Sequence, residues 1–299
     1  LTILLGTGAG LAVGWSPGAS LLLGGAFAIS SSIVALKLLM SRGDMESPHA
    51  RNALGLGIVQ DFSLAPMLAL VPVIAGERGG FIGISQSLLI SAVVLVVAFL
   101  LGTKLVPPVL RVFAHTGSRE LFLLVVVGVA LGVALATHVA GLSLGLGAFL
   151  AGVVVSESEY EERVLADIMP VRDLFATLFF LSVGMLIDPF VLLANWKIAL
   201  GLTLTLIVGK LLITGGAFLA AGLDHRTATL AAIVMAQIGE FSFVLAGSGF
   251  EHELIDLGQY GTILSVALCS ILGMTLLMKV SPFLVRFAEF LPGVASQER

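Results

Sequence analysis

The chain has 299 residues, a formal net charge of −4 and only 11% charged residues, whereas 58% of its residues are hydrophobic. An ordinary soluble domain carries roughly 25% charged residues, so this composition excludes that class and indicates a membrane protein. The single cysteine, Cys269, excludes a disulfide framework and a cysteine-based metal site. No nucleophile–base pair or metal-ligand spacing emerges, so we expect no enzyme, no cofactor and no nucleic-acid partner.

Apolar runs of about 20 residues recur along the chain, each long enough to cross the hydrocarbon core of a bilayer. Dividing the chain at charged, proline and glycine-rich breaks predicts an all-α polytopic fold with about ten transmembrane helices. The predicted spans are 1–14, 18–40, 51–76, 81–106, 118–137, 141–157, 171–187, 191–221, 227–249 and 257–280. Because Leu1 is not a methionine and already lies in an apolar run, we expect the chain to be incomplete at its amino end.

The basic residues predict the orientation of these spans. Of the fifteen Lys and Arg residues, twelve fall on the even-numbered connections and the carboxyl tail, and only Arg78 and Lys197 fall on the odd-numbered side. Because cytoplasmic loops carry an excess of Lys and Arg, both chain ends are predicted to be cytoplasmic. The remaining basic residue, Lys210, lies deep in the eighth predicted span.

Three ionisable residues lie within predicted spans. Asp61 is about halfway along the third span, Lys210 is in the eighth and Glu240 is in the ninth. A charged side chain at the bilayer centre costs roughly 2.5–3.5 kcal/mol on insertion scales, and such residues typically mark ion pathways or proton relays. These three residues therefore indicate where a functional site is to be expected.

Two predicted spans also carry polar interruptions. The second span contains Ser30, Ser31 and Ser32, and the ninth contains Gln237, Gly239 and Glu240. Unwound backbone is tolerated at membrane depth only where it is buried in protein or lines a cavity, and paired broken helices mark the binding sites of transporters. Their separation by seven spans reverses their orientation, so the layout suggests an inverted repeat of spans one to three and eight to ten.

Three stretches resemble the Kef-type branch of the monovalent cation/proton antiporters. "LGLGIVQDFSLAPMLALVP" (54–72) is similar to its Gln-Asp ion-site helix, and "AQIGEFSFVL" (236–245) to its Gly-Glu-Phe crossing helix. The long block 146–189 is similar to its central region. The order of the three stretches makes the resemblance specific.

The resemblance implies one transmembrane exchanger domain over 1–299 with two crossing broken helices. Its core helices would be about 1–76 and 191–280, and its scaffold and dimerisation helices about 81–187. Gln60 and Asp61 match the ion-site pair, and Lys210 falls where related antiporters keep a basic residue facing the aspartate. The resemblance further implies a homodimer in a bacterial or archaeal plasma membrane, and two helices before Leu1.

These residues predict a secondary antiporter that exchanges a monovalent cation, K⁺ or Na⁺, for H⁺. Asp61 would bind the cation and the proton alternately, and Ser30–Ser32 would complete the oxygen shell of the cation. Lys210 would pair with Asp61 when the site holds neither ion. A single carboxylate favours electroneutral exchange. Alternatives remain open: a K⁺ channel or uniporter using the same site, a bracing role for Glu240, and an interhelical hydrogen bond for Gln60.

Overall fold

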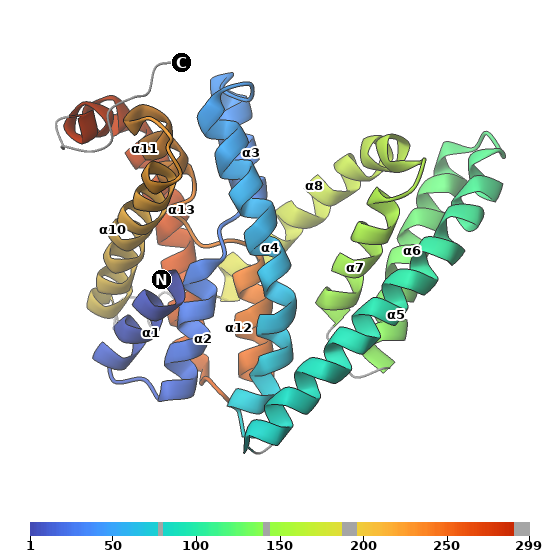
Figure 1. Cartoon of the computed structure of the whole chain (residues 1–299), viewed down its shortest axis with the longest axis horizontal. Coiled ribbons are helices and arrows are strands. Elements are labelled where there is room, and N and C mark those ends of the chain that lie inside the picture. Colours follow the sequence, from blue (N-terminus) through green and yellow to red (C-terminus); the bar gives the residue numbers. More distant parts are fainter. Residues whose placement is uncertain (77–79, 140–143, 187–195, 290–299) are drawn as a thin grey trace. The chain divides into compact units, whose positions relative to one another are not determined.

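A computed structural model describes residues 1–76, 80–139, 144–186 and 196–289 (Figure 1), and the secondary structure in these ranges is entirely helical. By length and hydropathy, five helical segments in the described ranges can cross a membrane: Pro17–Arg42, Pro48–Ile74, Arg119–Val139, Trp196–Ala220 and Leu257–Ala288. The chain is therefore a multi-pass helical membrane protein. The number of ten spans and the inverted repeat stay predictions.

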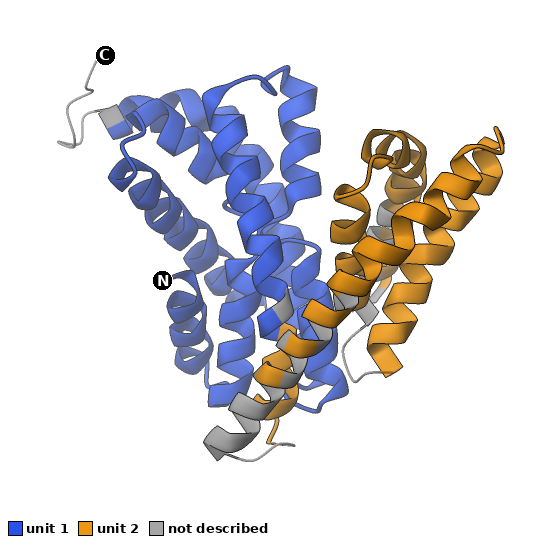
Figure 2. Ribbon diagram, turned by 45° about the vertical axis from the view of Figure 1, so that its right-hand side comes forward, with its two compact units in different colours: residues 1–67, 186–299 blue, residues 68–185 orange. Residues whose placement is uncertain are grey.

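The chain divides into two compact units (Figure 2), of which unit 1 comprises Leu1–Met67 and Leu186–Arg299 and unit 2 comprises Leu68–Met185. The helices of unit 1 are α1 (Thr2–Ala12), α2 (Pro17–Ala28), α3 (Ser32–Arg42), α4 (Pro48–Ile74, which runs on into unit 2), α10 (Trp196–Ala220), α11 (His225–Val234), α12 (Phe241–Glu251) and α13 (Leu257–Glu289). The predicted assignment of these units to core and scaffold roles stays a prediction.

The two interrupted spans of the sequence are each two helices in unit 1. The second predicted span is split into α2 and α3, and the ninth into α11 and α12. The short gaps, 29–31 and 235–240, coincide with the polar stretches of the sequence. Throughout this article they are called the first break (29–31) and the second break (235–240).

Close helix packing in unit 1 depends on small residues. A Cβ atom on Gly6 of α1 would lie 2.7 Å from the Cα of Gly24 on α2, which is closer than real Cβ contacts allow. Membrane helices have no hydrophobic driving force toward each other, so close backbone approach through small residues is a main source of their association. The α1–α2 pair shows this arrangement.

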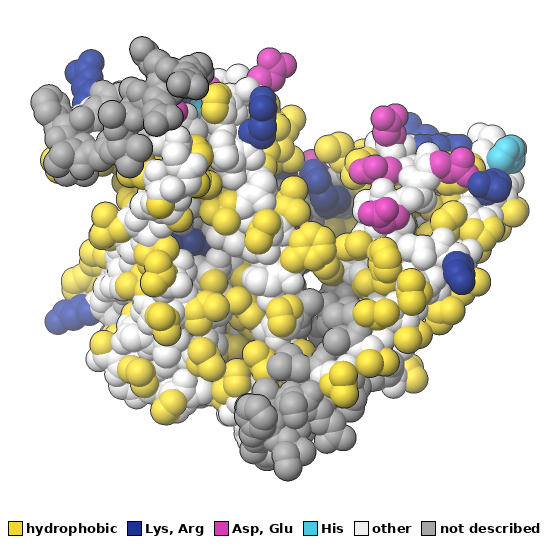
Figure 3. Space-filling view, viewed as in Figure 1, with side chains coloured by type: hydrophobic (Ala, Val, Ile, Leu, Met, Phe, Trp, Pro, Cys, Tyr) yellow, Lys and Arg dark blue, Asp and Glu magenta, His cyan; other side chains and the backbone are white. Residues whose placement is uncertain are grey.

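Helix α10 has two distinct faces. Leu204, Val208 and Leu212, spaced four residues apart, are exposed, whereas Leu206 and Lys210 are buried. On the face of each unit that Figure 3 shows, hydrophobic side chains cover much of the described surface and charged side chains are sparse. A helix placed in this way presents its apolar stripe to lipid and its polar side chain to the protein interior.

Unit 2 contains α5 (Gly80–Ala114), α6 (Arg119–Val139), α7 (Leu144–Ser156) and α8 (Glu161–Leu186). Its core cluster includes Leu110, Phe122 and Val154. The guanidinium of Arg163 lies 4.2 Å from the centroid of the Phe122 ring. Arg119 Nε lies 2.6 Å from Oδ1 of the largely buried Asp167, so a salt bridge joins α6 to α8.

Candidate ion-binding site

The first break exposes polar backbone groups inside unit 1. Ile29 adopts an extended conformation after the end of α2, and the side chain of Ser31 caps α3 by accepting a hydrogen bond from Val34 N at 3.0 Å. Serine is a preferred N-cap because its oxygen satisfies one of the free N–H groups of the first turn. Ser30 and Ser31 are almost fully buried, so the remaining groups of the break need protein partners.

The second break provides many of these partners. Gly239 N donates to Ile29 O at 2.9 Å, and Ser30 Oγ donates to Met235 O at 2.9 Å. A Cβ atom on Gly239 would lie 2.6 Å from the carbonyl oxygen of Ser30, so this approach requires glycine. The two breaks therefore contact each other directly through their main chains.

Gln237 completes the connection between the breaks. Its Oε1 accepts from Ser31 N at 2.9 Å and its Nε2 donates to Ser31 O at 3.0 Å, so its amide pairs with the main chain of Ser31 as a second strand would. Ser31 O also accepts the first intrahelical bond of α3, from Ala35 N. Ser31 O thus has two hydrogen-bond donors, whereas Ser31 N has Gln237 Oε1 as its one acceptor among the described residues.

Lys210 binds both breaks from α10. Its ammonium Nζ donates to Ser30 Oγ at 2.7 Å and to Gln237 O at 2.8 Å, and the residue is fully buried. Gln237 O lies just beyond the C-terminal end of α11, where the negative end of the helix dipole favours a cation. Two acceptors and this helix end together compensate part of the cost of burying the charge.

The predicted direct ion pair between Lys210 and Asp61 is not present among the described residues. Asp61 Oδ2 instead accepts a hydrogen bond from Ser32 Oγ at 2.9 Å. Ser32 is the first residue of α3, so the carboxylate lies near the positive end of a helix dipole. The physical reason for the difference is that each charge lies beside a helix end of opposite sign. Lys210 lies near the C-terminal end of α11, and Asp61 lies near the N-terminal end of α3.

One oxygen of Asp61 has no hydrogen-bond partner. Oδ1 is buried and unpartnered within the part of the chain that the structure describes, and the same is true of Oε2 of Glu240. Glu240 occupies the N-cap position of α12 without making a capping hydrogen bond. Buried carboxylate oxygens are normally satisfied, so an unpartnered one in a native fold needs an explanation.

The remaining sequence-predicted residues have defined positions. Gln60 Oε1 accepts a hydrogen bond from Ser30 N at 2.9 Å, so Gln60 joins α4 to the first break. A hydrogen bond to a neighbouring segment is one of the two roles expected for this residue. Of the three serines, only Ser32 contacts Asp61 through its hydroxyl. The Ser30 hydroxyl bonds to Met235 O of the second break and to Lys210, and the Ser31 hydroxyl caps α3 at Val34 N. The bracing bonds come from Gln237 and Gly239, whereas a bracing role of Glu240 stays a prediction.

Two further serines make hydrogen bonds at or beside the breaks, and one of them, Ser270, was not predicted from the sequence. Ser270 Oγ of α13 accepts from Ile238 N at 3.0 Å, and Ser242 Oγ of α12 donates to Ala26 O at 2.8 Å. Both serines are fully buried. The only signal of Ser270 in the sequence is a lone hydroxyl in an apolar run, which small-residue packing explains equally well, whereas Ser242 belongs to the polar interruption of the ninth predicted span.

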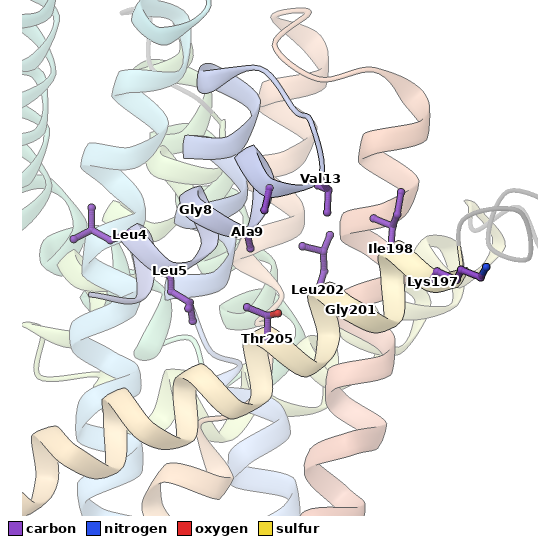
Figure 4. Close-up of a pocket in the computed structure, with 11 residues that line it drawn as sticks. Leu4, Leu5, Gly8, Ala9, Val13, Lys197, Ile198, Gly201, Leu202 and Thr205 are labelled. Carbon is purple, nitrogen blue, oxygen red and sulfur yellow. The ribbon is translucent and has the colours of Figure 1, made fainter.

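A groove between α1 and α10 is separate in character from this site. Figure 4 shows Leu5 of α1 and Val13, which follows α1, pointing toward α10, where Ile198 and Leu202 lie, and the remaining lining is mainly small and apolar apart from Lys197. Such a lining offers no oxygen shell for a cation. In the described ranges, no group of three or more His, Cys, Asp or Glu residues is arranged to hold a metal ion.

Comparison with known proteins identifies related chains. Residues 1–281 match the family model described as "Sodium/hydrogen exchanger, transmembrane". The chain is 38% identical over 278 residues to the "Putative cation/proton antiporter YbaL" of Escherichia coli (strain K12), which covers 90% of this chain and 50% of that protein. It is 35% identical over 277 residues to "K(+) efflux antiporter 1, chloroplastic" of Arabidopsis thaliana, covering 89% of this chain and 22% of that protein.

A third relative is the "Putative K(+) efflux antiporter KefB" of Alkalimonas amylolytica, 33% identical over 280 residues, which covers 92% of this chain and 41% of that protein. The chain spans half or less of the length of these three relatives. Their names are those of transporters, in agreement with the prediction that the chain is not an enzyme. The chain therefore belongs to the sodium/hydrogen exchanger family of transmembrane proteins, and to its Kef-type cation/proton antiporter branch.

Proposed function

We propose that this chain is the membrane domain of a secondary antiporter that exchanges a monovalent cation, K⁺ or Na⁺, for H⁺ at Asp61. The observation that carries the proposal is the half-buried carboxylate of Asp61, with Oδ2 bonded to Ser32 and a buried Oδ1 without a hydrogen-bond partner among the described residues. The names of the relatives support antiport as the activity.

Asp61 binds either ion because of its surroundings. A carboxylate in a partly buried, low-dielectric site is stabilised by neutralisation, and a proton or a desolvated monovalent cation supplies that neutralisation equally. Oδ1 is available for either ligand, whereas Oδ2 is oriented by the Ser32 hydroxyl. Since one carboxylate cannot hold both ions at once, binding of one releases the other, and this competition couples the two fluxes.

The contacting breaks serve as the rigid support of this site. Gln237 and Lys210 bond to Ser31 and Ser30 of the first break, and Ser32 follows directly at the start of α3. Lys210 is therefore a positioning residue in this proposal, acting on Asp61 through the first break and not through an ion pair. Gln60, next to Asp61 on α4, bonds to Ser30 N and fixes α4 against the same break.

The proposed stoichiometry follows from the single exchanging carboxylate. One cation for one proton makes the exchange electroneutral. We further propose an inverted-repeat fold with crossing broken helices, dimerisation through the scaffold helices of about 81–187, and a cytoplasmic carboxyl end. The last rests on the distribution of Lys and Arg, and three arginines assigned to the cytoplasmic side, Arg42, Arg226 and Arg286, line one recess of unit 1.

The test is proton movement in proteoliposomes that contain a pH-sensitive dye, with K⁺, Na⁺ or Li⁺ added in turn. Asp61→Asn keeps the size of the side chain and removes its charge, so we expect cation-dependent proton movement to disappear. Glu46→Gln removes an exposed carboxylate outside the site and serves as the matched control, with unchanged exchange expected. Proton exchange that survives in the Asn variant refutes the assigned site.

The same vesicles separate antiport from the channel alternative and test the stoichiometry. If wild-type protein conducts K⁺ without moving protons, the channel hypothesis replaces the antiporter. If exchange is steeply dependent on an imposed membrane potential, the proposed one-to-one exchange is wrong, because an electroneutral cycle moves no net charge.

A further inference from the structure

A second polar recess lies at one end of unit 1, away from the two breaks. It has a volume of about 380 Å³ and is formed by the C-terminal end of α3, the N-terminal ends of α4 and α11, and the C-terminal part of α13. Figure 1 shows the ends of α3 and α11 at the same end of the molecule. Its polar lining consists of Arg42, Asp44, His49, Arg226, Ser281 and Arg286.

The charges in this recess are not balanced. Arg42 Nε lies 3.3 Å from Asp44 Oδ2, and His49 Nε2 lies 4.0 Å from the same oxygen, so the one acidic side chain of the lining is already engaged. Within the described residues, the guanidinium groups of Arg226 and Arg286 have no hydrogen-bond or ion-pair partner. Three arginines and one aspartate leave a net charge of two positive units around the recess.

Helix ends also act on the potential of the recess. The N-terminal ends of α4, which begins at Pro48, and of α11, which begins at His225, are at the recess. The carboxylate of Asp224 caps α11, and the C-terminal end of α3 at Arg42 contributes the opposite sign, so the arginines supply most of the positive charge. The N-terminal end of a helix carries roughly half a positive elementary charge. Buried groups form part of the lining, since His49 is 8% exposed and Ser281 is 3% exposed, while the three arginines are exposed.

We propose that this recess binds a phosphate group that carries about two negative charges. Arginine forks match phosphate oxygens in bidentate geometry, and a phosphomonoester carries about −1.5 to −2 charges at neutral pH, which balances the net charge of the recess. A carboxylate carries only one charge and would leave half of the imbalance. Pockets of roughly 300–1,000 Å³ take small organic ligands, so the recess has room for more than a free phosphate ion.

A phosphate bound here would bridge helices that carry the ion site. Arg42 is on α3, which begins directly after the first break, and Arg226 is on α11, which ends at the second break. His49 is on α4, the helix of Asp61. The proposal goes beyond the exchange function and does not depend on it.

The test measures the melting temperature of the full chain in detergent as inorganic phosphate is titrated, with KCl at matched ionic strength as reference. A second arm adds vesicles of dioleoyl phosphatidic acid, with dioleoyl phosphatidylcholine as reference, because the phosphate can belong to a soluble molecule or to a lipid headgroup. We expect a saturable rise in melting temperature in the first arm for a soluble ligand, or in the second alone for a lipid. No rise in either arm overturns the proposal.

Variants identify the residues. A hydrogen bond to a charged group contributes about 1.5–3 kcal/mol, so Arg226→Gln and Arg286→Gln should each weaken apparent affinity about tenfold or more. Arg51→Gln removes an exposed charge from α4 outside the lining and should leave affinity unchanged. If a Gln variant does not fold, Arg226→Lys keeps the charge, loses the fork and should still weaken binding. Equal affinity in the recess variants and the Arg51 control overturns the proposal.

Discussion

The connection between the two breaks can be tested at Gln237. Gln237→Leu keeps the side-chain volume and removes both hydrogen bonds to the main chain of Ser31. Ser31 N then has no partner in a fully buried position, which costs about 1–3 kcal/mol, whereas Ser31 O keeps its bond from Ala35 N and loses about 0.5–1.5 kcal/mol. The free energy of unfolding should therefore fall by about 1.5–4.5 kcal/mol.

The assay is equilibrium unfolding of the purified chain in mixed detergent micelles. Thr203→Val is the matched control, because the Thr203 hydroxyl is also buried and hydrogen-bonded, at 2.7 Å to Ala199 O of its own helix. Its removal leaves no main-chain N–H without a partner, so we expect a loss of about 0.5–1.5 kcal/mol or less. Equal losses in the two variants would refute the reasoning that Gln237 satisfies the main chain of the first break.

Two other predictions concern stability. Gly239→Ala should lower the free energy of unfolding by about 1–3 kcal/mol, because its methyl group overlaps the Ser30 carbonyl. At Gly55 a Cβ atom has open space, so Gly55→Ala should instead raise the free energy of unfolding by about 0.4–1 kcal/mol. A similar result at both glycines would contradict the packing of the breaks. Burial raises the pKa of Asp224, but hydrogen bonds from Thr227 and from the main chain of Arg226 and Asp224 together outweigh it and place this pKa below its ordinary value of 3.8. The stability that this N-cap contributes is therefore present above pH 3.8 and lost as the pH falls through the lowered pKa. Asp224→Ala should then lower the free energy of unfolding by about 0.5–2 kcal/mol at neutral pH and leave it unchanged in acid. A loss that is the same at all pH values would refute the assigned cap.

Much of the site was predictable from the sequence because polar residues in apolar runs are few and costly. Ser30–Ser32 and the stretch around Gly239 predicted interruptions, and both are breaks between helices. The physical reason is general: unwound backbone at membrane depth requires partners, and the residue types that supply them stand out against leucine and valine. The depth of Asp61 and Lys210 in their spans was evident for the same reason.

The pairing of these residues was decided only by the tertiary structure. Lys210 and Ser30 are 180 positions apart in the chain, and Gln237 and Ser31 are 206 apart, so no local pattern relates them. Opposite charges suggested an ion pair between Lys210 and Asp61, yet each charge lies at a different end of a broken helix, where helix dipoles and hydroxyl groups compete as counter-charges. The sequence by itself determined which polar groups had to be satisfied inside the membrane, and the packing of α3, α4, α10 and α11 determined which group satisfies which.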